Sequence, residues 1–224
     1  SKQASTPVAP TVDSLEAIPG YSKRTIFEVP VGANATAIQK LIDEAFLLKG
    51  NKPVIHFPYG EFLIDKPLKI PAGSDMQLVG EGLIEASVLK KVKGSFRALP
   101  IITIAGPTQV QIRDLSVAGD EENEGFVPAI HFTGIDQPAS QVLIDQLYSQ
   151  CKRSIWADKL DYTYIEKNNS FFSDGNYIDA GPMVAAGKGT HKLTYWGGQF
   201  AGTTLLNKAS LTARDCWWEG EERT

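Results

Sequence analysis

The sequence contains few cysteines, no long apolar run and no excess of positive charge. Two cysteines, Cys151 and Cys216, are too few for a disulfide framework or for a zinc site of about four ligands. No segment reaches the roughly 18 consecutive apolar residues of a membrane span. With 22 Lys and Arg against 26 Asp and Glu, a formal charge of −4 argues against binding nucleic acid by neutralising its phosphates. These absences leave a globular protein of ordinary composition.

Turn-forming residues are abundant instead, with 20 Gly and 13 Pro among 224 residues. Residues 1–25 are polar and contain prolines, so we expect an extended leader. One amphipathic helix is predicted over residues 35–48, with Asn34 as its N-cap and Gly50 beyond its end. Its apolar side is formed by Ile38, Leu41, Ile42 and Ala45. The remaining three quarters of the chain indicate short strands and turns.

An internal repeat organises those strands. Each copy has a short apolar strand, a Gly or Pro turn and a second apolar strand, and the copies lie at residues 68–79, 102–115, 129–147, 154–165, 183–195 and 204–213. Aligning the first inward residue of each second strand gives Met76, Val110, Val142, Thr163, Leu193 and Leu211. Such a unit cannot bury its apolar side alone, so we expect about six coils, over residues 26–224, to stack as parallel strands. The pattern predicts an all-β parallel β-helix with an N-terminal amphipathic capping helix.

A family resemblance follows from four segments of the first coils. Residues 34–45, 53–64, 67–73 and 77–82 resemble the N-terminal cap and first coils of the pectate lyase superfamily, the right-handed single-stranded parallel β-helices. The superfamily often has an acidic Gly-Asp-Gly-type segment before the helix, where this chain has Val31-Gly-Ala-Asn34. The resemblance implies a secreted or cell-surface protein that binds or cleaves a polysaccharide. The superfamily includes lyases, glycoside hydrolases and non-catalytic members, so the fold does not choose among them.

Equivalent positions in successive coils form columns, which predict neighbours. Three residues past each inward position, the outward column comprises Val79, Arg113, Asp145, Glu166, Trp196 and Arg214. Asp145 and Glu166 fall on adjacent coils, about 4.8 Å apart, and could form a retaining-glycosidase pair or bind one Ca²⁺ together. Trp196 would provide a flat surface for a sugar ring. The alternative is that these residues are polar because an outward strand face must be polar.

The resemblance to lyases implies further roles. Arg113 or Arg214 would abstract a proton from an acidic sugar, while Asp145 and Glu166 would hold Ca²⁺. A second outward column contains Tyr148 and Trp217, and with Tyr164 it would offer aromatic surface for sugar rings, unless these rings only pack. The three histidines, His56 among them, have no Cys or His at metal spacing, and we expect them to be isolated.

Two hypotheses therefore remain open. One is an enzyme, a polysaccharide lyase or glycoside hydrolase. The other is a non-catalytic carbohydrate-binding, adhesive or structural module of a larger protein or a tailspike-like assembly. Because the sequence stops directly after a repeat, we expect further chain or a partner to cover the last coil. The column positions of Cys151 and Cys216 are about three coils apart, which predicts two free thiols.

Overall fold

The structure, a computed structural model, describes part of the chain. It covers residues 24–82, 85–97, 99–119, 128–135, 137, 140–151, 153–158, 171–173, 177–178, 184–196, 199–201, 205–214 and 217–219. From residue 153 onward only the backbone is described, apart from Ile155, and the same holds for Pro128 and Gln150. Over these residues the protein is mainly β, with parallel strands and one helix. The predicted leader, residues 1–25, lies almost entirely outside them.

The helix, α1, spans Ala35–Leu47. The strands are β1 (Ile26–Glu28), β2 (Val54–His56), β3 (Gly60–Ile64), β4 (Leu68–Ile70), β5 (Gln77–Val79), β6 (Ser87–Lys91), β7 (Ile102–Ala105), β8 (Gln111–Ala118), β9 (Pro128–Thr133), β10 (Leu143–Gln150), β11 (Arg153–Asp158), β12 (Phe171–Ser173), β13 (Tyr177–Ile178), β14 (Val184–Trp196), β15 (Gln199–Ala201), β16 (Leu205–Arg214) and β17 (Trp217–Glu219).

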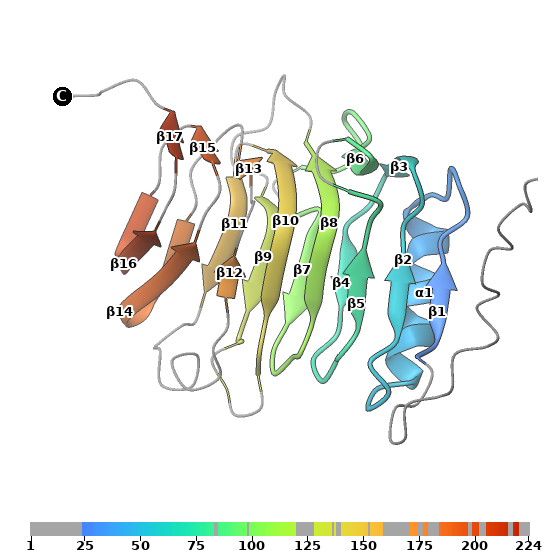
Figure 1. Cartoon of the computed structure of the whole chain (residues 1–224), viewed down its shortest axis with the longest axis horizontal. Coiled ribbons are helices and arrows are strands. Elements are labelled where there is room, and N and C mark those ends of the chain that lie inside the picture. The colour runs from blue at the N-terminus through green and yellow to red at the C-terminus, as the bar shows by residue number, and fades with distance from the viewer. Residues whose placement is uncertain are drawn as a thin grey trace, which may run out of the picture.

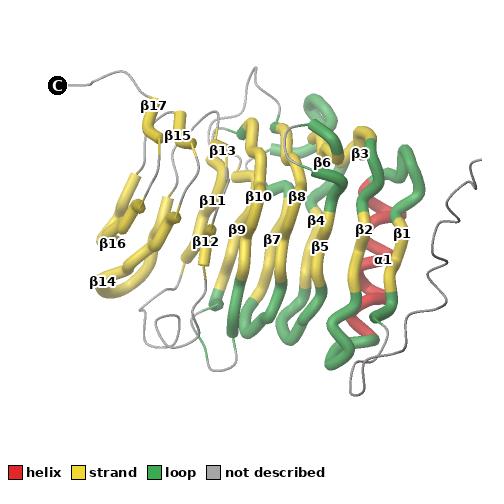
Figure 2. Tube along the Cα trace, in the orientation of Figure 1, coloured by secondary structure: helices red, strands yellow, loops and turns green. Residues whose placement is uncertain are grey.

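The helix forms where the sequence predicts it. Asn34 is the N-cap, and its Oδ1 accepts a hydrogen bond of 3.1 Å from the Ala37 N–H, which satisfies one of the unpaired donors of the first turn. Its apolar side is buried, at Ala35, Ile38, Ile42 and Ala45. That side packs against β2, β3 and β4, at the end of the strand stack where the chain begins (Figures 1 and 2).

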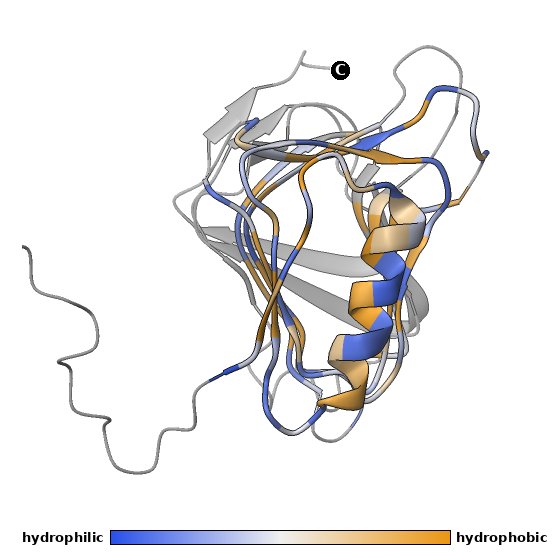
Figure 3. Cartoon of the chain, turned by 90° about the vertical axis from the view of Figure 1, so that its right-hand side faces the viewer, coloured by the Kyte–Doolittle hydropathy of each residue, from blue (hydrophilic) through white to orange (hydrophobic). Residues whose placement is uncertain are grey.

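Strands pair with strands of the next repeat rather than with their chain neighbours. One series runs β1, β2, β5, β8, β10 and β12, and another runs β4, β7, β9, β11 and β14, all in parallel. β3 and β6 pair in the same way, and β6 continues to the second half of β8. Figure 3, seen along the stack, shows strands on different sides of a shared interior.

Side chains of equivalent strand positions fill that interior. Ile55, Leu78, Ile112 and Ile144 lie next to one another across β2, β5, β8 and β10, and all four are fully buried. Burying side chains of this size stabilises a fold by about 1.5–3 kcal/mol each. The predicted inward residues Ile112, Leu115 and Val117 of β8, and Val110 just before it, are likewise buried. The predicted register of this strand is therefore confirmed.

One residue with a left-handed backbone conformation bends each of the strands β8 and β10, at equivalent positions. Asp114 in β8 and Gln146 in β10 have a φ of 54° each, and the flanking pairs Arg113 with Asp145 and Leu115 with Leu147 put them side by side. The bend explains why the buried residues Ile112 and Leu115 are three apart rather than two. It also marks the end of the outward face on which the candidate site lies.

Candidate functional site

One outward column of side chains crosses five neighbouring strands. The pairing registers align Glu28 with His56, His56 with Val79, Val79 with Arg113, and Arg113 with Asp145. Neighbouring parallel strands lie about 4.8 Å apart, so successive side chains of the column are within reach of each other. The structure thus confirms the predicted neighbours Val79, Arg113 and Asp145, and it extends the column to two strands that the sequence alignment left out.

Arg113 and Asp145 form an ion pair. Arg113 Nη2 lies 3.2 Å from Asp145 Oδ2, and the two side chains are 47% and 20% exposed. A pair this close to solvent adds about 1 kcal/mol or less to stability, so its main effect is to fix the direction of both groups. The remaining N–H groups of a guanidinium can donate to hydroxyl or carboxylate oxygens of a ligand.

His56 bridges two glutamates at the other end of the column. Its Nδ1 lies 2.8 Å from both carboxylate oxygens of Glu28, and its Nε2 lies 3.0 Å from Glu81 Oε1. Both ring nitrogens of His56 thus face carboxylate oxygens. The spacing of Cys and His along the chain gave no sign of these two partners.

Amide side chains form another outward column, which we call the amide column, beside the one that contains Arg113 and Asp145. Gln77 Nε2 donates to Gln111 Oε1 on the next strand, and Arg24 Nη1 donates to Gln77 Oε1 at 2.9 Å. Arg24 is itself held in place because its Nε donates to the Lys52 carbonyl at 2.7 Å. The result is a chain of three polar side chains that runs across the strands.

These amides line a cavity of about 210 Å³, to which Lys52, Asp75, Gln109 and Gln141 also contribute. Asp75 Oδ2 accepts hydrogen bonds from the backbone N–H groups of Gly50 and Lys52, at 2.8 and 3.1 Å. Within the described part of the chain, Arg24 Nη2 and Asp75 Oδ1 are buried without a hydrogen-bond partner. The other side chains of the lining offer amide donors and acceptors, so the cavity suits a polar group.

The other predicted site residues lie further along the stack. Trp196 in β14 pairs with Ser173 of β12 and with Arg214 of β16, which confirms that the backbones of Trp196 and Arg214 are neighbours. Trp217 in β17 pairs with Gln199. The side chains of these three residues lie outside the described residues.

The predicted pair of Asp145 with Glu166 receives no support from the strand pairing. β10 pairs with β8 along one edge and with β12 along the other, where Leu143 and Ile144 lie opposite Phe171 and Phe172. Glu166 and Tyr164 lie outside the described residues, so the carboxylate pair and its Ca²⁺ remain predictions. Among the residues that the structure describes, no three His, Cys, Asp or Glu side chains are grouped so that they could hold a metal ion.

Tyr148 requires a correction. It lies in the predicted column, opposite Ser116 of β8, but it is only 7% exposed and offers no open surface to a sugar ring. The column lies beyond the bend at Asp114 and Gln146, where the alternation no longer exposes every second residue. The neighbouring Ser116 is buried as well, and its Oγ accepts a hydrogen bond of 2.9 Å from the Glu85 N–H of the loop that covers it.

Comparisons with known proteins add no relative. No family model matches the chain, and neither a curated protein nor a solved structure matches it closely enough to indicate a relationship. Over the described residues, the structure also has no helix with the length and apolar character needed to cross a bilayer.

Proposed function

We propose that this protein is a right-handed parallel β-helix of the pectate lyase type that binds a polysaccharide outside the cell. The binding surface is the outward face of β1, β2, β5, β8 and β10. Parallel pairing between strands of successive repeats and a helix at the first repeat support this fold. A surface that repeats every 4.8 Å or so suits a ligand that is itself a chain of repeating units.

The observation that carries this proposal is the amide-lined cavity on the outward face. Gln77 and Gln111 line it with donors and acceptors, beside the guanidinium of Arg24. A sugar hydroxyl both donates and accepts, so it can pair with amide and guanidinium groups within one small cavity. The neighbouring Arg113 and Asp145 would contact the next units of the same chain.

Binding to a panel of neutral and acidic polysaccharides tests the proposal. We expect at least one to bind saturably, and the double variant Gln77→Ala, Gln111→Ala to weaken that binding by about ten-fold, or about 1.4 kcal/mol. Lys90→Ala is the control, because Lys90 is exposed on β6 and pairs with Glu61 across the strands at 2.8 Å. If no polysaccharide binds, or if both variants lose affinity equally, the proposal is wrong.

The products decide between binding and cleavage. Unsaturated ends that absorb ultraviolet light would identify a lyase, and new reducing ends without them would identify a hydrolase. Asp145→Asn and Glu166→Gln should each abolish product formation if the predicted carboxylates act in catalysis. A polysaccharide that binds and yields neither product would establish the non-catalytic module.

A further inference from the structure

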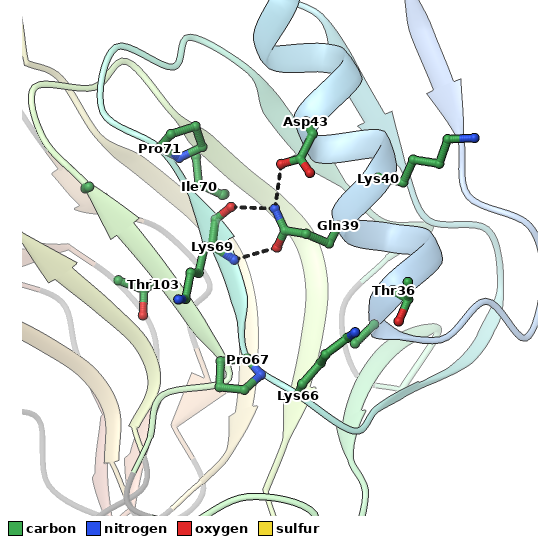
Figure 4. Close-up of a pocket in the computed structure, with 12 residues that line it drawn as sticks. Thr36, Gln39, Lys40, Asp43, Lys66, Pro67, Lys69, Ile70, Pro71 and Thr103 are labelled. Atoms are coloured by element: carbon green, nitrogen blue, oxygen red, sulfur yellow. Dashed lines mark hydrogen bonds between the residues drawn. The ribbon is translucent and has the colours of Figure 1, made fainter.

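A second cavity lies on another side of the molecule, between α1 and strands β4 and β7. Its volume is about 730 Å³, within the range of pockets that hold small organic molecules. Figure 4 shows its polar lining: Gln39 and Thr36 of the helix face Lys66, Lys69 and Thr103 of the strand side. None of these residues belongs to the polysaccharide face.

The amide of Gln39 sets the distance between the helix and β4. Its Nε2 donates to the Lys69 carbonyl at 2.9 Å, and its Oε1 accepts from the Lys69 N–H at 2.8 Å (Figure 4). Lys69 is therefore held by its backbone, and its side chain is left to point outward beside Thr103, its partner on β7. The cavity is a fixed part of the fold rather than a gap between loose elements.

The charge of the lining is positive on the strand side. Lys66 and Lys69 are exposed, and no described residue forms an ion pair with either ammonium group. Lys40 also borders the cavity, but it lies 3.7 Å from Glu44 and extends away from β4. The one acidic residue of the lining, Asp43, accepts a hydrogen bond of 2.9 Å from Gln39 Nε2. The ammonium groups of Lys66 and Lys69 are thus available to an anionic group of a ligand.

The floor between these charges is apolar. Pro67, Pro71 and Ala105 line it, and all three are partly exposed. A ligand that matches both features needs an anionic group for the lysines and an apolar body for the floor. Thr36 on the side of Lys66 and Thr103 on the side of Lys69 add hydroxyl groups to the lining (Figure 4).

We propose that this cavity binds an organic carboxylate with an apolar body, held by Lys66 and Lys69. The carboxylate accepts from the two ammonium groups, and the apolar body covers Pro67 and Pro71. A free organic acid would supply its hydrocarbon chain for these prolines, and an acidic sugar the C–H face of its ring. The site is independent of the polysaccharide face, and its existence does not depend on that proposal.

Titration with hexanoate and glucuronate, followed by the NMR signals of the Gln39 side-chain amide, tests the site. Hexanamide and glucose serve as their neutral counterparts. We expect saturable shifts with at least one carboxylate and none with its neutral counterpart. Preference for hexanoate would indicate a free acid as ligand, and preference for glucuronate a sugar acid.

Variants separate a local site from general charge attraction. Lys66→Gln together with Lys69→Gln should weaken carboxylate binding at least ten-fold, whereas Lys90→Gln should leave it unchanged. Asp43→Asn keeps an acceptor for Gln39 and removes the opposing charge, so it should strengthen binding about two-fold. The proposal is overturned if neither carboxylate binds saturably, if the neutral compounds bind equally well, or if Lys90→Gln has the effect of the double variant.

Discussion

At the scale of single residues, the outward column shows what a strand register predicts and what it does not. The alternation of β5, β8 and β10 was enough to place Val79, Arg113 and Asp145 side by side. Glu28 and His56 occupy the same column, and continuing the alignment into β1 and β2 would have found them. Glu81 could not be found in this way, because it follows β5 in a loop, where no periodicity fixes the direction of a side chain.

Cys151 is a free thiol, as the column register predicts, and it is buried. Cys216 lies outside the described residues. The Sγ atom of Cys151 lies 3.8 Å from the Val117 carbonyl oxygen. Burial raises the pKa of Cys151 from 9.0 to about 12, against smaller opposing effects of the Ser149 hydrogen bond and the Lys91 charge. The folded protein therefore keeps this thiol neutral at a pH where the unfolded chain has lost the proton.

This difference predicts a loss of stability in alkali. Below pH 9 both states hold the proton, and between pH 9 and 12 only the folded state does, so the free energy of unfolding falls as the pH rises. The slope from this group approaches about 1.4 kcal/mol per pH unit. Urea unfolding of the wild type and of Cys151→Ala from pH 8 to pH 11 measures it. Parallel curves for the two proteins would contradict the assignment.

At the scale of elements, α1 is placed as a cover for a strand edge. β4 has β7 on one side, and on the other side the Gln39 amide pairs with both backbone groups of Lys69, as a further strand would. An open edge of a parallel sheet can recruit another chain, and a helix laid over it prevents this. The sequence predicted the helix from its cap and apolar spacing, but the role of Gln39 depends on a tertiary contact 30 residues away.

Removing this amide should therefore cost more than removing an ordinary surface side chain. Gln39→Ala leaves the Lys69 N–H and carbonyl to water, and we expect unfolding in urea to show a loss of about 1 kcal/mol. Lys40→Ala is the control on the same helix, and its exposed ion pair with Glu44 should matter by less than about 0.5 kcal/mol. Equal losses in the two variants would show that Gln39 does not act through the β4 edge.

At the scale of the whole molecule, the strand series determines which residues share a site. Residues far apart in sequence become neighbours when they occupy the same column, as Glu28 and Asp145 occupy one column five strands wide. The sequence could predict this for the first three repeats, whose strands alternate clearly. It placed Thr163 and Glu166 of the fourth repeat next to β10, whereas β12 pairs with the first part of that strand, because loops of unequal length hide the register.

The same arrangement predicts how a core mutation spreads. Ile55, Ile112 and Ile144 belong to one buried column, in which Ile144 lies next to Ile112, and Leu78 separates Ile112 from Ile55. Replacing any of the three isoleucines by valine should cost about 1 kcal/mol. Residues in direct contact share the space that a lost methylene leaves, whereas sites about 10 Å apart usually act independently.

Double-mutant cycles measured by urea unfolding distinguish residues in direct contact from residues one strand further apart. Every variant replaces isoleucine by valine, so the chemical change is the same in both cycles. Ile112→Val with Ile144→Val should deviate from additivity by about 0.5 kcal/mol or more, because the two cavities adjoin. Ile112→Val with Ile55→Val should be additive, because the intact Leu78 keeps the two sites apart. If both pairs couple equally, perturbations spread through the whole stack, and the strands do not respond as a series of nearest neighbours.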